Sequence, residues 1–191
     1  MSDKKRLIVL SSPSGGGKST LAKVILDVLP NARFSISATT RAPRPGETDG
    51  VHYYFLTREE FQRRALSGEM AEYEEIFGNC YGTLRAATDE AIKNGEVLLF
   101  DVDVKGAFSL RRAFPDCSLL IFIAPPSVEV LEQRLRARST ETEEQLQKRL
   151  ARAEMELAQS KDFDCIVVND DLETAKSEMA ELIKKYFEGD E

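Results

Sequence analysis

A glycine-rich segment, residues 12–20 (SPSGGGKST), constrains the fold of this chain more than any other part of its sequence. It follows an apolar run at residues 6–11 and precedes a stretch with apolar residues at helical spacing, which Pro30 ends. Glycines between a strand and a helix let backbone N–H groups converge on phosphate oxygens, and the helix N-terminus favours the anion. We therefore predict a phosphate-binding loop that includes Ser14, Gly15, Gly16, Gly17, Lys18, Ser19 and Thr20.

Two side chains of this loop have the chemistry required to bind a nucleoside triphosphate. The Lys18 ammonium can reach the β- and γ-phosphates, and the Ser19 hydroxyl can ligate Mg²⁺. A second magnesium ligand is predicted at Asp101, which ends an apolar run in the Walker-B arrangement. The alternatives are a glycine-rich turn with a solvated lysine, and a strand-end carboxylate that caps a neighbouring helix.

Strands and helices alternate along most of the chain. Continuous apolar runs, typical of parallel strands covered on both faces, lie at residues 6–11, 97–101, 119–124 and 165–168. Helical patterns lie at residues 18–29, 127–138, 143–159 and 171–183. This alternation predicts an α/β fold with a three-layer core, in which helices cover both faces of a parallel sheet.

Residues 35–94 are more polar and form an excursion from this core. Its first part, residues 39–50, contains two prolines and two glycines, which exclude regular structure. Thr57 and Glu60 form a capping box at the start of a predicted helix. Strands are expected at residues 34–38, 53–55 and 70–77, and helices at residues 57–67 and 84–95.

Composition excludes several classes of protein. The chain has 26 Lys and Arg against 33 Asp and Glu, a net charge of −7, which argues against a dedicated nucleic-acid binder. Its longest apolar stretch, residues 119–126, is far shorter than the ~20 residues of a membrane-spanning helix. The single histidine and three widely spaced cysteines give neither a zinc pattern nor a disulfide framework. We expect a cytoplasmic protein whose partners include neither nucleic acid nor a membrane.

Nearly the whole chain resembles the guanylate kinases. The resemblance rests on short motifs in the family's order: the phosphate loop, SATTRAPRPGE at residues 37–47, GVHYYF at 50–55, Glu72, GNCYGT at 78–83, DVD at 101–103, IAPPS at 123–127, RSTETE at 138–143 and VNDD at 168–171. It implies a single domain, residues 1–191, with a core formed by residues 1–34, 95–126 and 160–191. It further implies a GMP-binding region at residues 35–94 and a helical lid at residues 127–159.

The resemblance also implies roles for individual residues in binding the nucleoside monophosphate. Arg41, Arg44, Tyr53 and Tyr81 would hold its phosphate, for which guanidinium forks and phenol donors are suited. Glu72, with Ser37, Thr83 and Asp103, would select guanine, because a carboxylate accepts both N1–H and N2–H₂ while adenine offers an acceptor at N1.

Further roles concern the ATP side and the lid. The resemblance implies that Arg134, Arg138 and Arg149 stabilise the charge that develops during transfer, together with Lys18. Asn169 would contact the ATP base, although a turn-forming asparagine is an alternative. Arg136 and Arg152 are expected to face solvent or to pair with glutamates.

The activity implied is Mg²⁺-dependent transfer of the ATP γ-phosphoryl group to GMP or dGMP, which gives ADP and the diphosphate. The chain could also form a homo-oligomer. One alternative is a guanylate-kinase-like module that has lost catalysis and binds phosphorylated partners, although Lys18, Ser19 and Asp101 are intact here. Another is a related kinase for a ribose bisphosphate or a different monophosphate, which would not need Glu72 and Thr83.

Overall fold

A five-stranded parallel sheet forms the centre of the computed structural model, which describes residues 6–76, 78–137 and 143–187. The strand order is β2-β7-β1-β8-β9, and every neighbouring pair is parallel. The bounds are β1 Leu7–Ser11, β2 Ala32–Phe34, β7 Val97–Asp101, β8 Ser118–Ala124 and β9 Cys165–Val168. Every residue of β1 and β8 is buried, as expected for strands covered on both faces.

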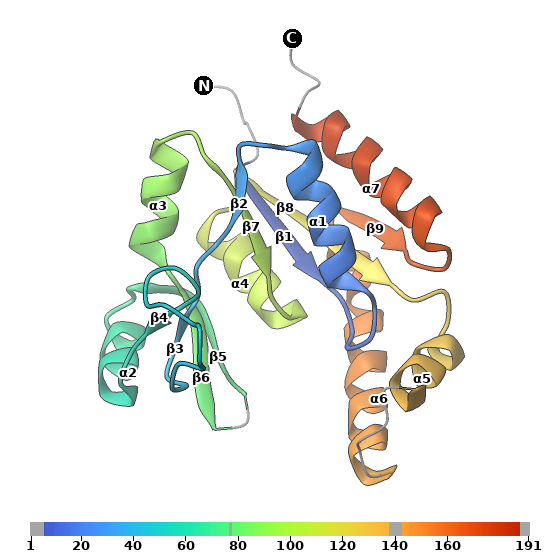
Figure 1. Ribbon diagram of the computed structural model, residues 1–191, viewed down its shortest axis with the longest axis horizontal. Coiled ribbons are helices and arrows are strands. Elements are labelled where there is room, and N and C mark those ends of the chain that lie inside the picture. Colours follow the sequence, from blue (N-terminus) through green and yellow to red (C-terminus); the bar gives the residue numbers. More distant parts are fainter. Residues whose placement is uncertain (1–5, 77, 138–142, 188–191) are drawn as a thin grey trace.

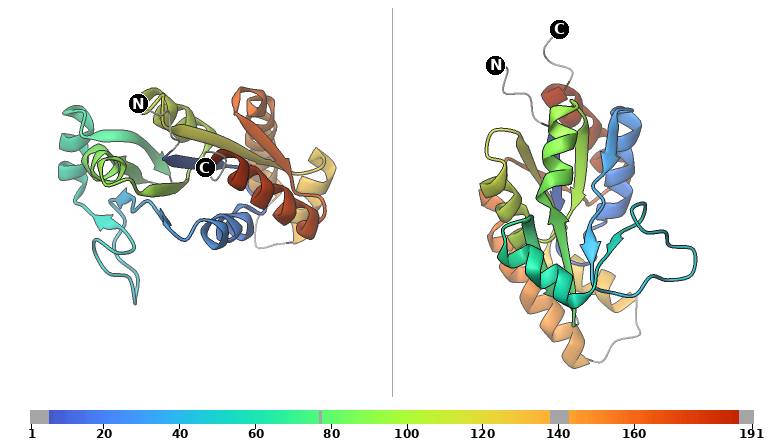
Figure 2. Two further views of the ribbon diagram at one scale, coloured as in Figure 1. Left: turned by 90° about the horizontal axis from the view of Figure 1, so that it is seen from above. Right: turned by 90° about the vertical axis from the view of Figure 1, so that its left-hand side faces the viewer.

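Helices cover both faces of this sheet, as the left view of Figure 2 shows. On one face, α1 (Lys18–Val28) and α7 (Leu172–Phe187) pack on a core that includes Leu21, Ile25 and Met179. On the other, α3 (Arg85–Lys93) and α4 (Val104–Ala113) pack on a second core that includes Phe100 and Phe122. The predicted three-layer α/β core is confirmed.

A second, four-stranded sheet projects from the core on one side (Figure 1). Its strand order is β4-β3-β6-β5, with bounds β3 Ala38–Thr39, β4 Tyr54–Phe55, β5 Met70–Ile76 and β6 Asn79–Leu84. It has its own small core of Ala38, Phe61, Met70 and Cys80, to which α2 (Arg58–Leu66) contributes the phenylalanine. The excursion is therefore mixed, because β3 and β4 are parallel while the other pairs are antiparallel.

Two helices, α5 (Val128–Ala137) and α6 (Glu143–Ala158), form the other projection in Figure 1. Five residues bury one another in a cluster separate from both cores of the central sheet: Leu131, Leu135, Leu146, Leu150 and Ala153. A short 3₁₀ turn, η1 (Ser160–Asp162), leads from α6 to β9. The helix pair thus has its own apolar contacts.

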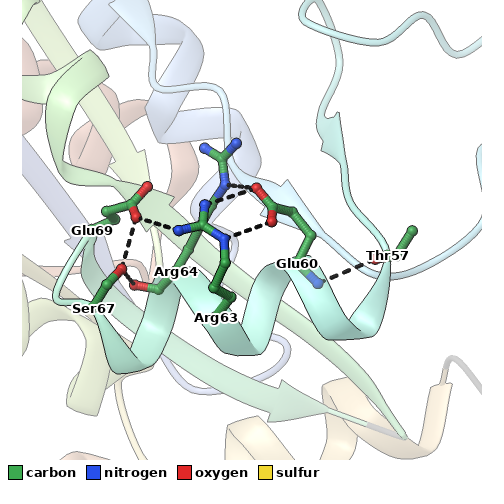
Figure 3. Close-up of polar contacts among 6 residues, drawn as sticks. All are labelled: Thr57, Glu60, Arg63, Arg64, Ser67 and Glu69. Atoms are coloured by element: carbon green, nitrogen blue, oxygen red, sulfur yellow. Dashed lines mark hydrogen bonds and ion pairs between the residues drawn. The ribbon is translucent and has the colours of Figure 1, made fainter.

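The capping box predicted at the start of α2 has two hydrogen bonds, and the structure contains one of them. Thr57 Oγ1 accepts a hydrogen bond from the Glu60 N–H at 3.1 Å. The Glu60 carboxylate accepts hydrogen bonds from Arg63 and Arg64 (Figure 3). The helix therefore begins with a side-chain cap, and the Glu60 carboxylate pairs with the arginines of the following turn and does not complete the capping box.

One expectation about secondary structure was wrong, and two elements, β6 and α4, were not expected. The strand expected at residues 34–38 is two strands in different sheets, β2 and β3, since the chain crosses between the sheets there. Helix α4 was not expected, because Gly106 and two arginines interrupt its apolar spacing between two strongly apolar strands. No helix within the described ranges is long and apolar enough to cross a membrane.

Candidate active site

A cavity of about 570 Å³ lies at the carboxyl ends of β1 and β7. Its walls come from the glycine-rich loop, the second sheet, the segment after β7 and helix α6. The structure brings these predicted site residues to its walls: Ser14, Lys18, Ser37, Tyr53, Glu72, Tyr81, Asp101, Asp103 and Arg149. Parallel strands of an α/β sheet place ligands at this edge, so both predicted nucleotide sites border one cavity.

The glycine-rich loop has the backbone shape that binding of phosphate requires. Gly15 and Gly17 adopt φ angles of 92° and 88°, a left-handed conformation that side chains disfavour. The Gly16 N–H donates to the Pro13 carbonyl at 2.9 Å, which closes the turn before α1. The loop surrounds a separate hollow of about 240 Å³, and Ser19 and Thr20 lie on its wall at the start of α1.

Asn169 supports this loop from the end of β9. Its side chain is buried, and Nδ2 donates to the Gly16 carbonyl at 2.9 Å. A Cβ atom on Gly17 would lie 2.1 Å from the same nitrogen, so only glycine leaves room for this contact. The amide nitrogen therefore holds the loop backbone. The predicted contact of Asn169 with the ATP base stays a prediction.

Lys18 and Asp101 form an ion pair at the wall of the cavity. The Lys18 ammonium also donates to the Val102 carbonyl at 3.3 Å, so it is held near the end of β7. The Asp101 side chain remains partly exposed. The Asp101 carboxylate is therefore accessible to solvent. Ser19 is also exposed, at the same end of the sheet. Hydroxyl and carboxylate oxygens of this kind suit Mg²⁺, which also keeps waters and phosphate ligands.

Arg41 is held in place by Glu47, a residue to which we had assigned no role. Arg41 Nη1 and Nη2 donate to the two Glu47 carboxylate oxygens at 2.9 and 2.8 Å. This hydrogen-bonded pair, with the Arg44 N–H, lowers the pKa of Glu47 to about 2. The Arg41 guanidinium also lies 5.3 Å from the centre of the Tyr53 ring. A carboxylate six residues after the arginine, in the same loop, is the sequence signal that would have identified this pair.

Of the remaining predicted phosphate ligands, Tyr53 and Tyr81 meet edge to face, with ring centres 6.3 Å apart. Both rings line the cavity. The Arg44 side chain is exposed, and its backbone N–H donates to Glu47 at 2.7 Å. The structure therefore places Arg41, Tyr53 and Tyr81 close together, whereas the Arg44 side chain is exposed to solvent.

Glu72 is the most strongly perturbed carboxyl group in the cavity. Burial raises its pKa to about 7, against the hydrogen bond that Thr83 Oγ1 donates to Glu72 Oε1 at 2.7 Å. The charges of Asp103 and Glu74 also contribute to this rise in pKa. Strongly perturbed carboxyls in a cavity are candidates for ligand recognition, and this one has its hydrogen-bonding partner in place.

Asp103 lies beside Glu72, at the start of α4. Its Oδ1 accepts from the Gly106 N–H at 2.8 Å as the helix cap, which leaves Oδ2 for other partners. Arg152 of α6 donates to that Oδ2 at 2.9 Å and lies 3.7 Å from the Glu74 carboxylate. Arg152 therefore pairs with glutamates, as expected, but it also pairs with Asp103, because the turn of α6 that carries it faces the cavity.

Two of the three arginines predicted to act during transfer lie within the described residues, and they have different positions. Arg149 Nη2 donates to the Ser14 hydroxyl in the glycine-rich loop. Arg134 Nη2 donates to the backbone carbonyl of Asn169 at 2.9 Å, behind the loop. Arg138 lies outside the described residues. One arginine therefore already contacts the predicted phosphate site, and a second contacts the residue that supports it.

Comparisons with known proteins agree with this geometry. A sequence model of the guanylate kinase family matches residues 4–186. The chain is 52% identical over 185 residues to a guanylate kinase of Chlorobaculum tepidum, with 97% of this chain and 95% of the relative covered. It is 48% identical to that of Salinibacter ruber, with 96% and 97% covered.

A solved structure is similar over the same extent. The crystal structure of guanylate kinase from Anaplasma phagocytophilum superposes with a TM-score of 0.71 at 33% identity, and covers 98% of this chain and 88% of that one. The family match, the sequence identities and the shared fold all span nearly the full chain. By this agreement of sequence and fold, the chain belongs to the guanylate kinase family.

Proposed function

We propose that this protein transfers the γ-phosphoryl group of ATP to GMP, and to dGMP, with Mg²⁺, giving ADP and the corresponding diphosphate. The observation that carries the proposal is the placement of Glu72 and of the Lys18–Asp101 pair on the walls of one cavity. Family membership supports the same reaction. The two substrates would then meet between the glycine-rich loop and the second sheet.

Guanine recognition is assigned to Glu72 and Thr83. An ionised Glu72 presents two oxygens to N1–H and N2–H₂ of guanine, and Thr83 orients one of them. Adenine would place a lone pair against the carboxylate and leave a buried charge without a donor, which makes such sites strongly selective. Ser37 and Asp103 line the same part of the cavity and are proposed to assist.

The phosphates of the two substrates are assigned to two separate sets of residues. We assign the monophosphate to Arg41, Arg44, Tyr53 and Tyr81, because the Arg41 fork is already oriented by Glu47. Loop residues Ser14 to Thr20 would bind the ATP phosphates through backbone N–H groups and Lys18. These assignments follow from the charge and hydrogen-bonding groups of the residues and from their positions in the structure.

Transfer itself requires positioning and charge stabilisation rather than a protein nucleophile. An oxygen of the GMP phosphate attacks the γ-phosphorus in line, and ADP leaves. Lys18 and Arg149 would stabilise the charge on the migrating group, with Arg134 and Arg138 joining from α5 and the segment after it. Mg²⁺, held through Ser19, Asp101 and the phosphates, would neutralise charge on the triphosphate.

We also propose a division of the domain by task. Residues 1–34, 95–126 and 160–191 would form the core, residues 35–94 the GMP-binding region and residues 127–159 a lid. The separate apolar cluster of α5 and α6 supports a lid that moves as a unit. Lid closure would exclude water and bring its arginines to the phosphates.

The test is a coupled assay of ADP release with GMP, dGMP, AMP, CMP and UMP as acceptors. We expect turnover with GMP and dGMP, and rates at least ~10³-fold lower with AMP, since the selectivity comes from an unpaired buried carboxylate. Lys18→Ala should lower kcat by ~10³-fold or more while GMP binding, measured by calorimetry, changes little. Binding of GMP without turnover in the wild type would instead identify a module that has lost catalysis.

A further inference from the structure

Arg152 connects α6 to the part of the cavity assigned to guanine. Its Nη2 donates to Asp103 Oδ2 at 2.9 Å and lies 3.7 Å from Glu74 Oε1, while its Nε donates to Glu156 Oε1 at 2.9 Å. Asp103 and Arg152 are 49 positions apart in the sequence. One guanidinium therefore joins three carboxylates from three elements.

The carboxyls that Arg152 faces are crowded. Side chains alternate along β5, so Glu72 and Glu74 lie on the same face, and both line the cavity together with Asp103. Burial and the neighbouring Asp103 carboxyl raise the pKa of Glu74, whereas Arg152 and Lys105 lower it. Three carboxyls so close together repel one another when ionised, and Arg152 is a cation in direct contact with two of them.

The Arg152 contacts are shielded from solvent more than the outer ion pairs of the same helix. The Arg152 side chain is 48% exposed, and those of its partners are 18% exposed for Asp103 and 30% for Glu74. Lys148 and Glu144, also on α6, are 74% and 79% exposed. Exposed pairs contribute little, since water and salt screen them. The Arg152 pairs therefore have the larger electrostatic effect.

We propose that Arg152 is a positioning residue for GMP: by pairing with Asp103 and Glu74 it balances the carboxylates around Glu72 and holds α6 against the guanine end of the cavity. This inference rests on the proposed function. Arg152 acts through Asp103 and Glu74, so it sets affinity for GMP and leaves the transfer step to other residues. The effect of Arg152 depends on Glu74, because the Glu74 carboxylate adds the negative charge that the Arg152 cation balances.

The experiment is a double-mutant cycle between Arg152 and Glu74, read by GMP titration calorimetry and by steady-state kinetics. We expect Arg152→Met to raise the dissociation constant and KM for GMP by about tenfold, with kcat and the KM for ATP within about twofold of wild type. Arg152→Met combined with Glu74→Ala should recover most of the lost affinity. Arg152→Lys, which keeps the charge, should recover part of it.

Lys148→Met is the matched control, because Lys148 is an exposed cation of the same helix and its ion-pair partner, Glu144, is exposed as well. It should leave all constants unchanged. Unchanged GMP affinity in Arg152→Met, additive effects in the cycle, or an equal loss in kcat would each overturn the inference. Wild-type protein that binds GMP but does not transfer phosphate would overturn the proposed function and leave the cycle measurable; wild-type protein that does not bind GMP would overturn both.

Discussion

At the scale of a single residue, Glu72 shows how a binding site opposes the stability of the fold. Its carboxyl is largely buried, and its pKa is raised to about 7, mainly by burial. The proposed guanine recognition would need the ionised form, but ionisation inside the protein has a free-energy cost. The same carboxylate that would select GMP therefore destabilises the folded protein without ligand.

We expect Glu72→Gln to remove this cost. The folded-state pKa lies above the ordinary value of 4.5, so Glu72 stabilises the fold only at low pH, and this contribution is lost as the pH rises through 7. The variant should therefore match wild type at pH 4 and exceed its free energy of unfolding by about 3 kcal/mol at pH 8. Urea denaturation at both pH values measures this, and a constant difference would contradict the assignment.

GMP binding by the same two proteins provides the complementary readout. Wild-type affinity should fall by about tenfold per pH unit below pH 7, because a proton must leave Glu72 before guanine binds. Glu72→Gln should bind GMP weakly and lack this dependence. The GMP phosphate titrates equally in both titrations, so the difference between the two profiles isolates Glu72.

At the scale of an element, α2 shows which polar contacts hold a helix in place. Thr57 caps a backbone N–H at the first turn, whereas Arg63 and Arg64 pair with Glu60 on the outer surface (Figure 3). A helix N-terminus has N–H groups without partners inside the helix, and a side-chain cap satisfies one of them. Surface ion pairs replace contacts that water also provides.

We therefore expect Thr57→Ala to lower the free energy of unfolding by about 1 kcal/mol. Arg63→Ala should give no measurable change, although it removes contacts to both Glu60 and Glu69. Thermal unfolding of the two variants beside wild type decides the comparison. A larger loss in the arginine variant would show that the ion pairs, rather than the cap, fix the position of α2.

The elements that could be predicted are those whose signals are local. The first strand, the glycine-rich loop and α1 follow from a continuous stretch of sequence, and the cap at Thr57 lies three residues from its partner. The division of residues 34–38 between two sheets depends on strands elsewhere in the chain. In the site, the contact between Arg152 and Asp103 could not be predicted, since the spacing of Arg152 on α6 is that of an ordinary surface arginine and Asp103 lies in another part of the sequence.

At the scale of the whole molecule, two parts project from the central sheet: the second sheet and the α5–α6 pair (Figure 1). The second sheet and α6 both contribute walls to the cavity. Each projecting part has its own small apolar cluster, so each keeps its shape if it moves against the central sheet. Phosphates that bridge the two sides would draw them together. Domain closure around ligands commonly follows this arrangement.

We expect small-angle scattering to show a smaller radius of gyration when GMP and a non-hydrolysable ATP analogue are both bound. Either ligand alone should give less compaction, because only the pair spans both projections. The glycine-rich loop has its support in the core, and the core itself should not change. An unchanged radius with both ligands bound would argue against the proposed lid.

The hydrogen bond between Asn169 and Gly16 joins residues 153 positions apart. The glycine-rich loop is synthesised well before β9, the strand that Asn169 follows. Neighbours β7 and β8 also follow β1 by many residues. A growing chain on the ribosome therefore carries an unsupported glycine-rich loop and an unpaired apolar strand until these later segments emerge, a period in which chaperones can protect such segments.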